Sequence, residues 1–516
     1  MSDPTSTTVV SPDYSKSFFG HPRGLATLFM TEFFERFTYY GMRALLVLFL
    51  VAATNAANPG FGIDRETAGA VYGLYTGAVY LCCLPGGWIA DRLIGQRSAV
   101  FWGGVLIALG NFILAIPASP AVFYFGLAVI VVGVGLLKPN VSAIVGALYE
   151  GQSGARRDAG FSIFYMGINL GAFIAPLIAG TLGEAWNWRV GFFFAGLAML
   201  IGVVQYKFTE QYLGHAGLAP QNLPTGERSR SWRVVLVAGG LIVLLGALLF
   251  AGVIPVSIQT LAQSFVTAMV ALAVAFFGYV LFFADLTTYE RKRVAVIAVF
   301  FLAAAVFWAG FEQAATTFNL FTQDFTDRSW FGRLFPDGMH PASWYQSANP
   351  IFIIVFAPFF AWLWVALGRR NLDPSAPAKF GLGLVLLGVG FLIMMFAAQL
   401  AASTGSKVAP TWMLLTYLLH TFGELCLSPV GLSNVTKLSP QRYVGQMMGT
   451  WFLGAAVGNL IAGLLGGHIG SSEVGDMPGQ FLQMALVGGG AGILLLLLSR
   501  PLANWMGNAR PQQPNI

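Results

Sequence analysis

Charge is scarce in this sequence. Only 10% of its 516 residues are Asp, Glu, Lys or Arg, whereas a soluble domain carries roughly 25%. Apolar residues make up 56% of the chain, and its mean hydropathy is +0.70. This composition excludes a soluble enzyme and predicts an all-α protein that crosses a lipid bilayer many times.

Cysteine is also rare. Cys82, Cys83 and Cys426 lie in apolar stretches without the spacing of metal ligands, so each is interpreted as a small buried side chain. We therefore expect no metal and no cofactor. The net charge of +6 is spread thinly over loops, which argues against a nucleic-acid partner. The first 22 residues lack the apolar core of a secretory signal, so we expect the first span to be retained.

Long apolar stretches recur along the whole chain. A membrane-spanning helix needs about 20 mainly apolar residues, and the sequence predicts fourteen such spans. They cover residues 24–54, 66–90, 97–118, 121–149, 158–183, 187–207, 233–253, 258–284, 294–325, 342–368, 378–402, 409–438, 443–468 and 476–503.

The basic residues predict how these spans are oriented. With the N-terminus in the cytoplasm, 20 of the 28 Lys and Arg residues fall on the cytoplasmic side and five on the other side. The remaining three, Arg36, Arg43 and Lys138, lie inside spans. Because Lys and Arg are enriched in cytoplasmic loops, we expect both termini in the cytoplasm.

The spans fall into three groups. Residues 1–207 hold six spans, residues 208–293 hold a polar linker and two inserted spans, and residues 294–516 hold six more. Two six-helix bundles around a central cavity are typical of the major facilitator architecture. The loop "GGWIADRLIGQR" (86–97) resembles a cytoplasmic motif of that superfamily.

Several ionisable side chains nevertheless lie inside spans. Each costs about 2.5–3.5 kcal/mol near the middle of a membrane helix, so such residues usually face a bundle interior or an aqueous cavity. The set consists of Glu32, Glu35, Arg36, Arg43, Lys138, Glu312 and Glu424.

The first span carries a polar stripe. Its members follow the spacing i, i+3, i+4, i+7, i+8 and i+11, which is one face of an α-helix. We expect this face to line a cavity; the alternative is an ion-pair set that only fixes helix packing, an interpretation that stays open above all for Arg43. The stripe consists of Glu32, Glu35, Arg36, Tyr39, Tyr40 and Arg43.

Two further spans of the first half carry polar residues. Lys138 precedes a proline, with Ser142 one turn later; it either pairs with a glutamate of the first span or extends to the membrane surface. Tyr165 and Asn169 share a face of the fifth span. Asn169 is a candidate for ligand binding or for a hydrogen bond that ties two helices together.

The second half supplies a matching set. The span at 294–325 is expected to be one helix, and its spacing places Trp308, Glu312, Thr316 and Asn319 on one face. Asn349 precedes a proline, Glu424 lies one turn before Ser428, and Trp451 is either a cavity residue or a packing residue. The fixed cations Arg36 and Lys138 therefore belong to the first half, while Glu312 and Glu424 belong to the second.

This distribution favours a charge-separated solute. A small zwitterion could place its carboxylate against the first half and its ammonium group against the second, with charge-assisted hydrogen bonds at both ends. Carboxylates beside cations can also exchange a proton when an ion pair opens. The residues by themselves thus predict a proton-coupled carrier of a small zwitterion.

Three motifs carry a family resemblance. "ExxERFxYY" (Glu32–Tyr40), "GGWIADRLIGQR" (86–97) and "FYMGINLGA" (Phe164–Ala172) resemble the patterns of the proton-dependent oligopeptide transporter (POT/PTR) family. The resemblance extends from "FFGHPRG" to "LSPVGLS" and "MMGTWFLG" in the second half. The two inserted spans match its prokaryotic branch, which implies a bacterial inner membrane.

The resemblance implies import of di- and tripeptides with protons by alternating access, through a protein expected to act as a monomer. It implies that the peptide carboxylate is bound by Arg36, Tyr40 and Lys138. It implies that the amino end is held by Asn169, Asn349 and Glu424. The side-chain pockets would be shaped by Tyr39, Tyr80, Trp308 and Trp451. Proton-sensitive salt bridges would involve Glu32, Glu35 and Lys138, and Arg36 with Glu312.

One position departs from the family pattern. Animal members carry a functional histidine on the second helix, where this chain has Gly73, so carboxylates must carry the protons, with His420 as a further candidate. The alternatives are a carrier of drugs, amino acids or other small organic ions, and an intramembrane enzyme or sensor. The sequence contains no Gly-x-Ser-x-Gly or His-Glu-x-x-His motif, which argues against the enzyme.

Overall fold

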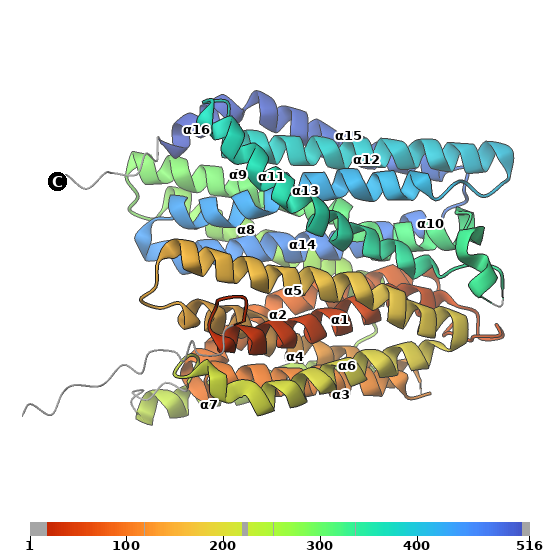
Figure 1. The fold of residues 1–516 in the computed structure, drawn as a ribbon, viewed down its shortest axis with the longest axis horizontal. Coiled ribbons are helices and arrows are strands. Elements are labelled where there is room, and N and C mark those ends of the chain that lie inside the picture. Colours follow the sequence, from red (N-terminus) through yellow and green to blue (C-terminus); the bar gives the residue numbers. More distant parts are fainter. Residues whose placement is uncertain (1–17, 118, 219–224, 251, 336, 508–516) are drawn as a thin grey trace, which may run out of the picture.

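The computed structural model describes residues 18–117, 119–218, 225–250, 252–335 and 337–507. Its long helices run side by side in one bundle (Figure 1). The first half contains α1 (Arg23–Val51), α2 (Arg65–Ile89), η1 (Ala90–Ile94), α3 (Gln96–Ala115), α4 (Pro120–Leu148), α5 (Gly154–Gly180), η2 (Thr181–Trp186), α6 (Trp188–Thr209) and η3 (Glu210–Leu213).

Two inserted helices and the second half follow. The inserted helices are α7 (Thr225–Phe250) and α8 (Ile258–Phe282). The second half contains α9 (Thr288–Phe311), η4 (Glu312–Ala315), α10 (Thr317–Phe325), η5 (Ser329–Leu334), η6 (Ala342–Ser347), α11 (Ala348–Arg369), α12 (Ala376–Thr404), α13 (Thr411–Leu438), η7 (Gln441–Tyr443), α14 (Val444–Ser471), α15 (Met477–Leu497) and α16 (Ser499–Met506).

The predicted polytopic helical fold is confirmed. Within the described residues, thirteen helices are long and apolar enough to cross a membrane. The one predicted span outside this set, residues 24–54, corresponds to α1, a 29-residue helix of the same bundle whose charged stripe lowers its mean hydropathy.

Local sequence accounts for several helix ends. The Asp64 side chain accepts a hydrogen bond from the Thr67 N–H and caps α2, while Thr287 and Glu290 form a capping box at the start of α9.

Two predicted spans are interrupted. The stretch 294–325 is not one helix, because the 3₁₀ segment η4 separates α9 from α10. The stretch 476–503 divides into α15 and the short α16, because Pro501 has no N–H to continue the helical ladder. The helix α16 lies against α9 and α12 at the end of the bundle where α9 begins (Figure 1).

Buried apolar side chains form two large cores. One is made mainly by α1–α6 and the other by α8–α15. The inserted helices lie apart from each other: α7 contacts the first half at η1, whereas α8 packs against α2, α9 and α14. Side chains of α7 are largely exposed, as expected for a helix that faces lipid on most of its surface.

The two halves are joined at the end of the bundle where α2 begins and α14 ends. There Gly69 and Gly73 of α2 cross Gly463 and Gly467 of α14 so closely that a Cβ atom on Gly463 would lie 2.5 Å from the Gly69 carbonyl oxygen. Small residues allow two membrane helices to approach in this way. The crossing therefore depends on glycine at these positions.

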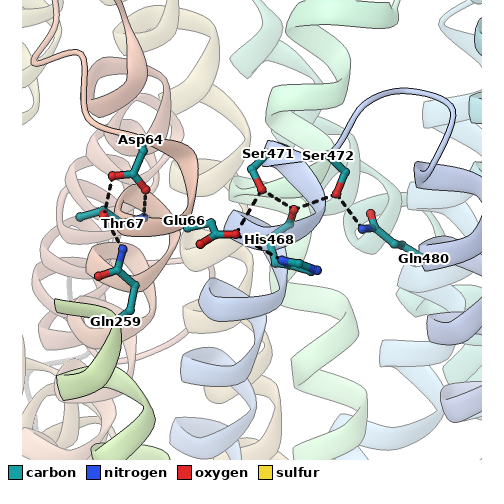
Figure 2. A network of polar contacts seen from close by, with 8 residues as sticks. All are labelled: Asp64, Glu66, Thr67, Gln259, His468, Ser471, Ser472 and Gln480. Carbon is teal, nitrogen blue, oxygen red and sulfur yellow. Dashed lines mark hydrogen bonds and ion pairs between the residues drawn. The ribbon is translucent and has the colours of Figure 1, made fainter. Parts of the chain in front are cut away.

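Polar contacts reinforce this closure. Glu66 of α2 accepts hydrogen bonds from His468 and Ser471 of α14 (Figure 2). Arg65 pairs with Asp324 of α10 at 2.7 Å. At the opposite end, the ion pairs of the described residues join groups within one half or to an inserted helix. Ion pairs that join α2 to the second half are thus found, among the described residues, at this end of the bundle.

Candidate functional site: a charged cavity between the two halves

A cavity of about 300 Å³ lies between the halves and is lined by both of them. From α1 it receives Glu32, Arg36, Tyr40 and Arg43, which are spaced i, i+4, i+8 and i+11. Successive residues of a helix turn by about 100°, so these four side chains point into one sector of about 80°. The predicted cavity-lining stripe is confirmed for these four residues.

Two members of the predicted stripe do not line the cavity. Glu35 is fully buried, and Tyr39 stacks on Tyr75 of α2 with ring centroids 6.3 Å apart. Around the helix axis, Glu35 (i+3) lies about 60° and Tyr39 (i+7) about 20° from Glu32, in the direction opposite to the cavity-lining sector. Both side chains therefore point toward α2. The prediction that Tyr39 shapes a pocket surface is therefore wrong; Tyr39 supports the lining from behind.

Arg36 holds the two glutamates of the motif together. Its Nε atom lies 3.0 Å from Glu32 Oε1 and also contacts Glu35 Oε2. Glu32 Oε2, Glu35 Oε1 and Arg36 Nη2 are buried without a hydrogen-bond partner among the described residues. Two carboxylate oxygens and one guanidinium nitrogen of the cluster therefore have unused hydrogen-bonding capacity.

A second ion pair bridges the halves. Arg43 Nη2 of α1 lies 2.9 Å from Glu312 Oε2 of η4, and Tyr72 of α2 donates a hydrogen bond to the same oxygen at 3.1 Å. The predicted pair of Arg36 with Glu312 is wrong for this structure. Arg43 lies two turns, or about 10.5 Å, beyond Arg36 along α1, and the break at η4 places Glu312 opposite Arg43.

Lys138 of α4 faces the cavity but forms no ion pair among the described residues. Its Nζ atom lies 4.3 Å from the ring centroid of Tyr80, which also lines the cavity. A cation over an aromatic face gains about 0.5–2 kcal/mol. The predicted pairing with the glutamates of α1 is therefore absent here, and the ammonium group is open to a ligand.

The second half contributes an acidic site. Asn349 of α11 donates hydrogen bonds to Glu424 Oε2 at 2.9 Å and to Thr421 Oγ1 at 3.0 Å, both on α13. Asn349, Glu424 and Ser428 line the cavity. The contact orients the Glu424 carboxylate without neutralising it, so an ammonium group could bind there by a charge-assisted hydrogen bond.

The remaining predicted residues also face the cavity. Asn169 of α5 lines it and donates to the carbonyl of Tyr165 in its own helix at 2.9 Å. This bond therefore does not tie two helices together. The side chains of Trp308 and Trp451 line the cavity, and their role in side-chain pockets stays a prediction.

Some lining residues lacked a signal in the sequence. Gln346 lies in η6 directly before α11, and its polarity beside Asn349 was an available hint. Phe311, Tyr417 and Phe452 also line the cavity, but aromatic residues in apolar helices look the same in sequence whether they face lipid or a site. His420 lines the cavity with its Nε2 atom 3.2 Å from the Leu387 carbonyl oxygen.

Comparison with known proteins gives consistent matches. Residues 97–474 match the model of the POT family. The peptide transporter YePEPT of Yersinia enterocolitica is 40% identical over 96% of this chain and 98% of its own length. A di-/tripeptide transporter of Lactococcus lactis subsp. cremoris is 37% identical over 96% and 98%.

Solved structures agree. A crystal structure of a peptide transporter POT in complex with sulfate has a TM-score of 0.87 and 38% identity, covering 95% of this chain and 97% of that one. A POT family transporter in complex with 5-aminolevulinic acid has a TM-score of 0.83 and 33% identity, covering 94% and 98%.

Proposed function

Because the chain belongs to the POT family of membrane transporters, we propose that it imports di- and tripeptides together with protons by alternating access. The observation that carries the proposal is the distribution of charge in the cavity. Lys138 and Arg36 lie on the first half, and Glu424 lies on the second. The names of the relatives, which include peptide and di-/tripeptide transporters, support the same substrate class.

A peptide would span the cavity between these groups. Its carboxylate would bind Lys138, Arg36 and the Tyr40 hydroxyl, and its ammonium group would bind Glu424, with Asn349 and Asn169 nearby. Tyr80, Trp308 and Trp451 would then contact the side chains. Recognition of the two charged ends with apolar walls between them lets one site accept many peptides.

Protons are the proposed coupling ion, and the proposal requires no other cofactor. Glu32, Glu35 and Arg36 form one cluster in which protonation of a carboxylate would release the guanidinium group for the peptide. The pair of Arg43 with Glu312 joins the halves at the closed end, so its protonation would favour opening there. One chain contains the whole cavity, which supports action as a monomer.

The proposed location is a bacterial inner membrane, with both termini in the cytoplasm. Bacterial relatives that match along nearly their whole length support this location. In that orientation the end of the bundle where α2 begins would face outward. On this proposal the chain is a carrier rather than an enzyme.

The test is transport by purified protein in liposomes. A labelled dipeptide should accumulate against its gradient when the outside is acidic, and accumulation should stop when a protonophore dissipates the gradient. Flux of drugs or single amino acids without dipeptide flux would refute the proposal in favour of another organic-ion carrier.

A pair of variants separates coupling from binding. Glu32→Gln and Glu35→Gln should lose gradient-driven uptake but keep exchange of external for internal peptide, because exchange needs no net proton movement. Equal loss of both activities would show that the cluster serves packing or peptide binding rather than coupling.

A further inference from the structure

A second, apolar hollow lies on the outside of the second half, away from the charged cavity. It has a volume of about 610 Å³ and is bounded by the inserted helix α8 together with α9, α12, α14 and α15. Its rim is open, because Phe282, Leu302 and Val487 are 78%, 62% and 57% exposed. These helices cross the membrane, so the opening faces the acyl chains of the bilayer.

Small residues create the hollow. Gly278 of α8 lines it, and a Cβ atom built there would meet no atom within 4 Å. Ala298, Ala305 and Ala309 form the facing wall on α9. A groove of this kind cannot be filled by the protein's own side chains and is left for an external apolar chain.

A basic residue continues the same helical face beyond the groove. Arg291 precedes Ala298 by seven residues and Leu302 by eleven, which places all three within about 40° of one another around α9. Arg291 and the adjacent Lys292 are exposed and form no ion pair among the described residues. The groove therefore has a cationic end at the membrane surface where α9 begins.

Three charged groups beside Arg291 and Lys292 are already engaged. Arg293 donates to the Met506 carbonyl oxygen at 3.1 Å, and Arg442 contacts the backbone of Asp285. Glu290 folds back onto the backbone N–H of Thr287 at the start of α9. This cluster has two carboxylates, Asp285 and Glu290, and four cations, Arg291, Lys292, Arg293 and Arg442, so its net charge is positive. Arg291 and Lys292 are exposed.

We propose that this groove binds an anionic phospholipid. One acyl chain lies in the hollow between α8 and α9, and the phosphate group contacts Arg291 and Lys292. Basic clusters at the membrane surface attract anionic headgroups, and burial of each CH₂ group of a chain adds a favourable contribution. The inserted helix α8 thereby serves as the outer wall of a lipid site.

The experiment is native mass spectrometry of the full chain in detergent, titrated with palmitoyl-oleoyl phosphatidylglycerol or with phosphatidylcholine of the same chains. The wild type should retain phosphatidylglycerol in preference to phosphatidylcholine. Arg291→Gln should reduce that retention about fivefold, the effect of one basic residue near an anionic surface. Gly278→Phe, which fills the hollow, should abolish retention of both lipids.

Matched controls use positions outside the groove. Arg369→Gln removes an exposed arginine elsewhere, and Gly240→Phe adds a ring on α7, where a Cβ atom also meets nothing within 4 Å; both should behave as wild type. Equal retention of the two lipids by the wild type, or unchanged retention by Gly278→Phe, would overturn the proposal. Displacement of the lipid by glycerol 3-phosphate would also overturn it, because a headgroup site without an acyl groove would then suffice.

Discussion

The buried pair of Arg43 with Glu312 is expected to hold the two halves together. Both side chains are almost completely buried, and the 2.9 Å contact joins α1 of one half to η4 of the other. Glu312→Gln keeps the shape and a hydrogen-bond partner for Tyr72 but removes the negative charge. Arg43 then remains buried without a counter-ion for as long as this end of the transporter stays closed.

The magnitude follows from the burial. Removing one partner of a buried ion pair costs about 3–5 kcal/mol. The rings of Tyr40 and Tyr72, whose centroids lie 5.4 and 5.9 Å from the Arg43 guanidinium carbon, retain part of the stabilisation, so we expect the lower end of that range. A change of about 3 kcal/mol shifts the equilibrium between closed and open states by about two orders of magnitude, toward the state in which Arg43 reaches water.

Distances between two spin labels, measured by double electron–electron resonance spectroscopy, report this shift in the equilibrium between closed and open states. Spin labels at Asn55 and Ser406 would sit in exposed loops of the two halves at the closed end, in a background without the native cysteines. Glu312→Gln should move the distance distribution to longer values and abolish gradient-driven uptake. The double variant Arg43→Met with Glu312→Gln should return toward wild-type distances, because loss of both charges leaves none unpaired.

A second carboxylate at the same interface serves as the control. Glu66 and His468 also join the halves, but their side chains are 51% and 67% exposed. Such surface pairs contribute only about 0–1 kcal/mol, so Glu66→Gln should change the distances little. If Glu312→Gln left the distances unchanged, or if Glu66→Gln had an equal effect, the pair of Arg43 with Glu312 would not be the contact that holds this end closed.

Three further outcomes are expected. Lys138→Ala should remove the preference for peptides with a free carboxylate, so that dipeptides and their amides compete equally in uptake assays. Glu424→Gln should raise the KM for dipeptides about tenfold to a hundredfold, since a hydrogen bond to a charged group contributes about 1.5–3 kcal/mol, and should not affect N-acetyl dipeptides. Asp64→Ala should remove the N-cap of α2 and lower the free energy of unfolding by about 1 kcal/mol, which is measured as a lower Tm. Burial raises the pKa of Asp64, but hydrogen bonds from the Thr67 N–H and hydroxyl lower it more, so this difference in Tm should be full at neutral pH and shrink as the pH falls below about 4.

Local sequence was sufficient to predict the helices and part of the site. Apolar length located the spans, and helical spacing put Glu32, Arg36, Tyr40 and Arg43 on one face. The same spacing also included Glu35 and Tyr39, because periodicity defines a sector of a helix and does not tell where the sector's edge meets a neighbouring helix. The packing of α2 against that edge decides the matter.

Contacts across the halves were not predictable in this way. The pairing of Glu312 depends on the break at η4 and on the relative height of α1 and α9, which are set by tertiary packing rather than by any local pattern. Arg43 appeared ambiguous in the sequence because it lies near a helix end. In the folded bundle that end lies beside the partner half, where the charge finds its counter-ion.

The arrangement of ion pairs also bears on the substrate. The Arg43–Glu312 pair is internally neutral, and Glu32, Glu35 and Arg36 form a cluster. The remaining charges are Lys138, which rests on an aromatic ring, and Glu424, which has only polar neighbours as direct partners among the described residues. A zwitterion presents one charge of each sign and can therefore bind Lys138 and Glu424 at the two ends of the cavity without opening the pair of Arg43 with Glu312.

Counting all seven ionisable side chains in their ordinary states gives three positive and four negative charges. A zwitterionic peptide leaves this balance at −1, and one bound proton brings it to zero. A neutral site is the least costly to carry through a membrane of low dielectric constant. On the proposed function, one proton bound together with the zwitterionic peptide would therefore give a neutral site for the transport step.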